Sequence, residues 1–278
     1  EQIFTKFLNE EMNYGERNME IAMFLFHRIE QSNRGNFFKL LVFGPSGVGK
    51  TSVVKKIGEL NEGGAVIVNL SSLIRVDNVE KTDVNLEIER LNELFKYCQK
   101  NNSFLIFENL EIFLLERNYN FRDISPDEQH KVIQKKIQII IGIFINYWLS
   151  LLSSQPVTIV IITNSIPQDI DRANSRRIHD WFRFDLPNYE ERLKIFEKKL
   201  NSYHFSKTFF ESLANLTKDF SFRDIEKICN KVESNNCIVT EEMIVNYIKQ
   251  IRKLSNQRKE DFKRNFVKSI NKFIKKSR

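Results

Sequence analysis

The sequence predicts an α/β fold, in which a parallel sheet is followed by a C-terminal helical lid. Apolar, strand-like segments alternate with helical segments over residues 37–187, and only helical patterns follow Pro187. Strands separated by helices pair in parallel, because the crossover between them takes about a dozen residues or more. A glycine-rich loop at residues 44–51, between the first strand and the next helix, also favours this fold.

The N-terminal segment and the sheet domain come first along the chain. Residues 1–36 are predicted to be helical, because Ile21, Phe24, Leu25 and Ile29 recur at helix spacing. Residues 37–187 are assigned to the nucleotide-binding core. Its strands are predicted at residues 37–43, 65–70, 104–107, 157–163 and 183–186. Its helices are predicted to begin at Lys50 and to cover residues 84–100 and 126–153.

The lid is assigned to residues 188–254. Asn188, with Glu191 three residues later, forms a capping box that predicts a helix over residues 189–200. Further lid helices are predicted at residues 208–216, 222–232 and 240–254. Residues 255–278 are assigned to a separate basic, amphipathic C-terminal helix.

The glycine-rich loop fits the phosphate-binding pattern G-x-x-x-x-G-K-[ST] completely. Its glycines let backbone N–H groups turn toward phosphates at the start of a helix. Lys50 is expected to reach the β- and γ-phosphates, and the Thr51 hydroxyl to bind Mg²⁺. The core is therefore predicted to be a P-loop nucleoside triphosphatase with ATP and Mg²⁺ as its cofactors. The predicted nucleotide-binding residues are Gly44, Pro45, Ser46, Gly47, Val48, Gly49, Lys50, Thr51 and Ser52.

A second site residue follows the strand predicted at residues 104–107. A P-loop enzyme needs a carboxylate at the tip of a neighbouring strand to hold the metal ion. Glu108 stands at that position, and it is the predicted second Mg²⁺ residue. An acid that is simply solvated at a strand end would explain Glu108 alone about as well.

Taken in order, these motifs resemble those of the AAA family of ATPases over about residues 37–254. Residues 44–51 resemble Walker A, and residues 104–111 resemble Walker B. The resemblance implies that Asn164 is sensor 1, which orients the attacking water or contacts the γ-phosphate. It implies that Arg176 and Arg177 are arginine fingers for a neighbouring subunit, although they also fit an ordinary solvated pair. Residues 220–225 resemble the lid segment near the nucleotide, where Arg223 is the expected contact.

Three positions depart from the pattern of that family. Asn109 stands where the family has the glutamate that activates the attacking water, and an amide cannot accept that proton. The chain is still predicted to be an ATP hydrolase, with slow or absent turnover as the alternative. Glu111 is the candidate substitute base. Residues 71–79 lack the aromatic residue and glycine of members that thread polypeptide through a pore. Only one arginine pair is present where members often carry two spaced arginines.

The net charge of +7 is concentrated in the C-terminal tail. Residues 252–278 hold eleven Lys and Arg against Glu260 and Asp261. Apolar residues recur there at helix spacing, which fits a helix packed on the body of the protein. Binding to nucleic acid or to an anionic membrane surface is the alternative for this tail.

The preferred function is an ATP-driven subunit that remodels a protein complex within a ring, expected from the family to be a hexamer. A non-hydrolysing structural or regulatory module is one alternative, favoured by Asn109. A nucleic-acid-associated loader or initiator is the other, favoured only by the tail. The sequence carries no evident signal peptide or membrane span, and its three cysteines are too few for a disulfide framework. A cytoplasmic or nuclear location is therefore expected.

Overall fold

The computed structural model describes residues 2–10, 15–32, 35–69, 84–108, 156–164, 175–234 and 240–253. By its internal contacts the chain divides into two compact units. One unit comprises Glu1–Met23, Gly44–Lys50 and Phe184–Lys263, and the other comprises Phe24–Phe43, Thr51–Arg183 and Arg264–Arg278. Several predicted features lie outside the described residues, namely the helix at 126–153, the segment 71–79 and most of the basic tail.

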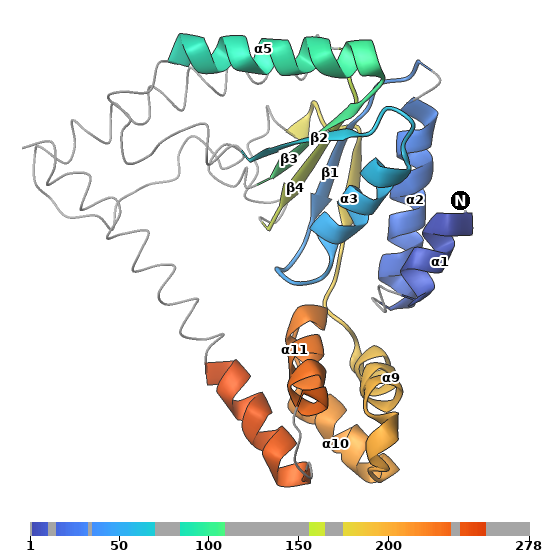
Figure 1. Cartoon of the computed structure of the whole chain (residues 1–278), viewed down its shortest axis with the longest axis vertical. Helices are drawn as coiled ribbons and strands as arrows, with labels where there is room; N and C mark the ends of the chain where they lie inside the picture. The colour runs from blue at the N-terminus through green and yellow to red at the C-terminus, as the bar shows by residue number, and fades with distance from the viewer. Residues whose placement is uncertain are drawn as a thin grey trace, which may run out of the picture. The chain divides into compact units, whose positions relative to one another are not determined.

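A five-stranded parallel sheet forms the centre of the second unit, in the order β2-β3-β4-β1-β5 (Figure 1). The strands are β1 (Lys39–Phe43), β2 (Ala65–Asn69), β3 (Phe104–Glu108), β4 (Ile159–Thr163) and β5 (Asp180–Arg183). Every residue of β1 and β4 is buried, whereas the edge strands β2 and β5 are partly exposed. Central strands of a parallel sheet are covered on both faces, which explains their continuous apolar sequence. The α/β prediction is confirmed.

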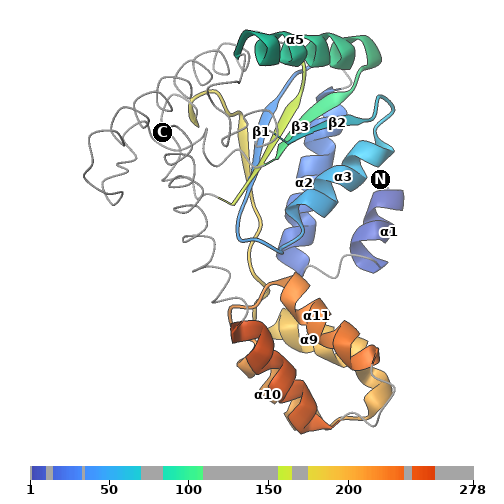
Figure 2. The ribbon, with the colours of Figure 1, turned by 60° about the vertical axis from the view of Figure 1, so that its left-hand side comes forward.

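Helices lie beside this sheet in both ribbon views (Figures 1 and 2). They are α2 (Glu16–Ser32), α3 (Lys50–Leu60) and α5 (Val84–Asn101). Leu91, Phe95 and Cys98 of α5 are buried, as their helical spacing predicts. On α3, Gly58 leaves room for the Ala65 side chain, because a Cβ there would lie 2.7 Å from the Ala65 Cβ.

The lid lies in the first unit, and its described residues form helices joined by short turns, with no strand among them. It contains α9 (Tyr189–Lys199), the 3₁₀ turn η3 (Asn201–Tyr203), α10 (Lys207–Leu216), α11 (Phe222–Glu233) and a helix over residues 241–253. The capping box of Asn188 and Glu191 at the start of α9 is confirmed. Arg192 is buried in the lid and donates to the carbonyls of Ala214 (3.0 Å) and Pro187 (2.7 Å). Its guanidinium ties α9 to α10 and to the segment that enters the lid.

The N-terminal segment also belongs to the first unit up to Met23. It forms α1 (Gln2–Glu10) and the start of α2. The buried Asn18 side chain makes two hydrogen bonds with the backbone of Asp185: its Nδ2 donates to the carbonyl (2.9 Å), and its Oδ1 accepts from the N–H (3.0 Å). These two hydrogen bonds connect α2 to the segment between β5 and α9.

Three details of the predicted elements were wrong. The last strand is Asp180–Arg183 rather than residues 183–186, because its pairing with Leu40–Phe43 of β1 sets its position. The fourth strand begins at Ile159, two residues later than predicted. The first strand begins at Lys39, two residues later than predicted.

Candidate functional site

The phosphate loop follows β1 directly and closes on the lid segment of its own unit. Gly44, Gly47 and Gly49 all have positive φ angles, which L side chains rarely adopt. A Cβ on Gly44 would collide with the Phe184 carbonyl, and one on Gly47 would lie 2.5 Å from the Ser221 hydroxyl. The glycines of the motif are therefore needed both for the backbone turn and for the close approach of the lid segment.

Lys50 is buried at the start of α3 and is 5% exposed. Its ammonium donates hydrogen bonds to the carbonyls of Gly44 (2.7 Å) and Pro45 (2.6 Å). The Lys50 side chain thus lies inside the turn of the loop, whose backbone N–H groups are the ones predicted to bind phosphate.

The N-terminus of α11 contacts the phosphate loop. The Arg223 N–H donates to the Gly47 carbonyl at 3.2 Å. Ser221 caps α11, and Asp224 completes a capping box, with the Ser221 hydroxyl donating to Asp224 Oδ2 at 2.7 Å. Arg223, the predicted lid contact, is therefore placed beside the loop through its backbone.

Glu108 and Asn164 lie at one edge of the sheet, in the second unit. Glu108 ends β3, and its register partner on β4 is Ile162, while Thr163 pairs with Phe43 at the end of β1. Asn164 follows Thr163 directly and is exposed. Because these strands are parallel, their carboxyl ends meet at the same edge, where the two predicted residues stand.

The Glu108 carboxylate has an incomplete set of partners. Its side chain is 19% exposed, and its Oε1 is buried with no hydrogen-bond partner among the described residues. The ammonium of Lys55, on α3, lies 3.8 Å from this oxygen. Lys55 was not among the predicted site residues. Its spacing of four residues from Thr51 was the only signal for it in the sequence, because such residues share a helix face.

Arg176 and Arg177 lie at the opposite edge of the sheet. They precede β5, and their neighbour His179 bonds to Lys39, the first residue of β1. Arg176 is exposed and Arg177 half-buried. The structure therefore does not bring the arginine pair together with Glu108 and Asn164. Asn109 and Glu111 lie outside the described residues.

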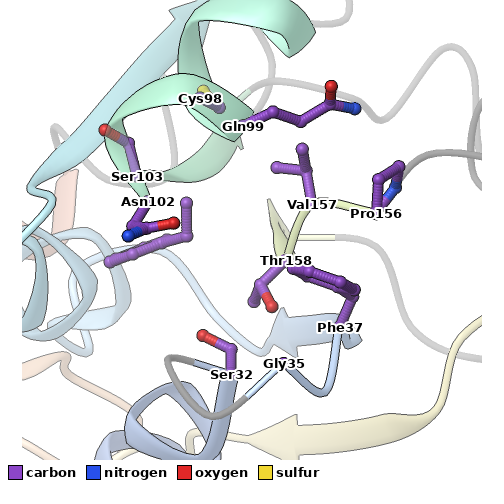
Figure 3. A pocket seen from close by; sticks show the side chains of 11 residues that line it. Ser32, Gly35, Phe37, Cys98, Gln99, Asn102, Ser103, Pro156, Val157 and Thr158 are labelled. Atoms are coloured by element: carbon purple, nitrogen blue, oxygen red, sulfur yellow. The ribbon is translucent and has the colours of Figure 1, made fainter.

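A cavity of about 370 Å³ is present in the second unit, at the opposite end of the strands from Glu108 and Asn164 (Figure 3). It lies at the amino ends of the strands, beside Ser103, Phe104 and Thr158. The Ser103 hydroxyl donates to the Gly63 carbonyl, and the Thr158 hydroxyl accepts from the Phe38 N–H. Burial raises the pKa of the Cys98 thiol in its wall to about 11, which keeps this sulfur protonated at neutral pH.

Comparison with known proteins identifies the family. The model of the "ATPase family associated with various cellular activities (AAA)" matches residues 40–186, about half of the chain. The chain belongs to the AAA family. This match spans the phosphate loop, the five strands and both residues at the carboxyl edge of the sheet.

Several curated AAA relatives are similar to this chain. The mitochondrial sorting homolog of Caenorhabditis elegans is 25% identical over 68% of this chain and 51% of its own length. Fidgetin-like protein 1 of Drosophila melanogaster is 26% identical, over 68% of this chain and 34% of its own. A probable spastin homolog of Brugia malayi is 26% identical, over 74% of this chain and 42% of its own length. The chain thus spans between about a third and a half of the length of these relatives.

A solved AAA structure shares the fold. It is the crystal structure of the FIGL-1 AAA domain in complex with ADP, with a TM-score of 0.52 and 19% identity. The match covers 85% of this chain and 79% of that one. Among the residues that the structure describes, no helix is long and apolar enough to cross a bilayer.

Proposed function

We propose that this chain binds Mg·ATP and works as one subunit of an ATP-driven ring, hexameric as in the family, that remodels a protein complex. The observation that carries the proposal is the hydrogen bond from the Arg223 N–H to the Gly47 carbonyl. It joins the loop that would hold the phosphates to a helix of the lid. A change in the loop on binding or hydrolysis would thereby act on the lid. The proposed location is cytoplasmic or nuclear.

Triphosphate binding is assigned to the loop and to Lys50. The backbone N–H groups of Gly44–Gly49 would donate to phosphate oxygens, with the Ser52 N–H in the first turn of α3. The Lys50 ammonium now donates to two neutral carbonyls of the loop. A phosphate oxygen is a stronger, charged acceptor, so a shift of the ammonium toward it is favourable.

Mg²⁺ binding is assigned to Thr51 and Glu108. A hydroxyl and a carboxylate are the oxygen ligands that Mg²⁺ prefers. The buried Glu108 Oε1, which lacks a hydrogen-bond partner, has capacity for a cation or for a water bound to one. When bound, the ion would neutralise charge on the phosphates.

The other residues that match motifs of the AAA family are assigned roles of their own. Asn164, exposed just after β4, would orient the attacking water, and Arg223 would contact the nucleotide from the lid. Arg176 and Arg177 precede β5 and so lie at the far edge of the sheet from Glu108. A strand of four or five residues separates the two edges by roughly 13–17 Å. That placement favours a role for the pair at the site of a second copy rather than at its own.

A non-hydrolysing AAA module is the second candidate function. Asn109 cannot accept a proton from water, and only Glu111 is near enough in sequence to replace the missing glutamate. In this case bound ATP would stabilise a ring or an adjacent active domain without being cleaved.

Nucleotide affinity and steady-state turnover together test these proposals. Lys50→Ala should weaken AMP-PNP binding in the presence of Mg²⁺ by about 10- to 100-fold, because charged hydrogen bonds to phosphate are lost. Lys56→Ala, on α3 where Lys56 pairs with Glu59 at 3.0 Å, is the matched control and should bind as wild type does. Calorimetry gives the affinities, and phosphate release gives the turnover.

Each outcome of this experiment decides between the candidates. Failure of the wild type to bind ATP, ADP or AMP-PNP would overturn the proposed function. Tight binding with no turnover at any protein concentration would overturn the motor and support the structural module. Turnover that Glu111→Gln abolishes would assign the base to Glu111.

A further inference from the structure

The Lys55–Glu108 pair is not a satisfied ion pair. The Lys55 Nζ lies 3.8 Å from Glu108 Oε1, which is beyond hydrogen-bond distance. That oxygen is buried and has no other hydrogen-bond partner among the described residues. Lys55 therefore balances the charge of the carboxylate while leaving its oxygen without a donor.

Lys55 also stands on the helix face that carries the other proposed ligand of the metal ion. Thr51 and Lys55 are four residues apart on α3, so their side chains share one face. Lys55 thus has one proposed Mg²⁺ residue on its own helix face and the other 3.8 Å from its ammonium. Any cation that these two oxygens hold has a positive charge as its neighbour.

We propose that Lys55 competes with the divalent cation for Glu108 and so lowers the affinity of the nucleotide site for Mg²⁺. This inference rests on the proposed function. The Lys55 side chain is 44% exposed and sits on a long flexible stem, so the ammonium can withdraw into water when the cation binds. The competition is therefore reversible.

The charges around Glu108 determine how strongly this competition affects Mg²⁺ binding. Asn109 is neutral, so Glu108 is the only acidic side chain of the Glu108-Asn109 pair. Lys55 offsets that single negative charge. The cation is then attracted mainly by the phosphates of the nucleotide, and binding of nucleotide depends less on Mg²⁺ than it would without Lys55.

The test is the dependence of ADP affinity on free Mg²⁺ in wild type and Lys55→Met. Methionine removes the charge and keeps a long apolar stem. Calorimetric titrations with ADP over a series of Mg²⁺ concentrations give the Mg²⁺ midpoint. We expect Lys55→Met to lower this midpoint by about five- to tenfold, because a positive charge is removed from the surroundings of a divalent cation. The difference should shrink at high ionic strength.

Two variants separate charge from packing. Lys55→Arg keeps the positive charge, so its Mg²⁺ midpoint should not fall below that of wild type. Lys56→Met removes a charge from the next residue of the same helix, where it pairs with Glu59 rather than Glu108, and should leave the midpoint unchanged. A fall of the midpoint in either variant would overturn the proposal.

The result also distinguishes this inference from the function on which it rests. If wild type binds no ADP at any Mg²⁺ concentration, the proposed function fails. If wild type binds ADP and Lys55→Met has an equal or higher Mg²⁺ midpoint, only the role of Lys55 is overturned.

Discussion

At the start of β1 a histidine nitrogen replaces a backbone acceptor. The backbone N–H of Lys39 donates to the imidazole Nδ1 of His179 at 2.8 Å. The backbone N–H of His179 donates in turn to the Lys39 carbonyl at 2.7 Å. Nδ1 can accept only when the imidazole is neutral. Burial, with Lys39 and Arg28, lowers the pKa of His179, and Asp180 opposes this effect. The residue therefore links β1 to the segment before β5 in its neutral form.

This arrangement predicts an acid-sensitive contribution to stability. Because the pKa of His179 is lower in the folded chain than its usual 6.5, the unfolded chain binds more protons as pH falls below about 7. The contribution is therefore complete above the unfolded pKa and is lost as pH falls through the folded one. His179→Asn, whose Oδ1 can still accept, should unfold in urea with a smaller loss of stability between about pH 7 and 5.

His204→Asn is the control for this prediction. His204 is exposed in the lid, at a left-handed backbone position (φ 52°) that asparagine tolerates. An equal pH dependence in wild type and His179→Asn would contradict the prediction.

The candidate site residues differ in how far sequence could place them. The phosphate loop is contiguous, so its glycine pattern and flanking strand were enough to locate it. The strand ends that carry Glu108 and Asn164 are confirmed, whereas the roles of these residues stay predictions. The contact of Lys55 with Glu108 joins a helix to a strand distant in sequence. The spacing from Thr51 places Lys55 on the helix face of the loop, but it does not show which strand that face meets.

At the scale of the elements, the lid offers two serine caps in different settings. Ser206 caps α10 and accepts from the Phe209 N–H, whereas Ser221 caps α11 beside Gly47. Each hydroxyl accepts a backbone N–H that the helix leaves without a partner. Only α11 carries the backbone bond to the phosphate loop.

The two caps give a matched test of the link between the lid and the loop. Ser221→Ala and Ser206→Ala should each lower the free energy of unfolding by about 1 kcal/mol. Only Ser221→Ala should also weaken nucleotide binding, because fraying of α11 loosens the Arg223–Gly47 hydrogen bond. Thermal unfolding gives the stabilities, and calorimetry with ADP gives the affinities. Equal losses of ADP affinity in the two variants would show that α11 does not support the loop.

The elements were predictable where their signal is local. The capping box at Asn188 and the apolar central strands depend on neighbours in sequence, and both are confirmed. The position of β5 could not be predicted from local sequence, because its residues are partly exposed and lack a continuous apolar run. Its register depends on β1 and on the Arg28–Asp180 ion pair (2.6 Å), which are long-range contacts. Phe184 lies within the predicted strand 183–186 but follows the observed one, and it is fully buried beside Gly44.

At the scale of the whole molecule, the arginine pair indicates how copies would associate. Within the second unit, Arg176 and Arg177 lie at the amino edge of the sheet, and Glu108 lies at the carboxyl edge. A subunit that lends its arginines to one neighbour and accepts those of another uses two different surfaces. Such a head-to-tail contact closes into a ring when its rotation closes. The separation of these residues within one chain therefore supports the proposed ring.

This geometry predicts assembly that depends on both nucleotide and arginine. With Mg²⁺ and AMP-PNP, the chain should sediment as a larger species than without nucleotide, because the γ-phosphate gives the arginines of a neighbour an anionic partner. Arg177→Ala should raise the protein concentration needed for assembly by about tenfold or more, the loss of one charged hydrogen-bonded contact. Lys198→Ala, at an exposed lid position, should assemble as wild type does. Sedimentation velocity over a concentration series measures each case. Equal assembly of Arg177→Ala and wild type would exclude Arg177 from the interface. Equal assembly of Arg176→Ala as well would exclude the pair.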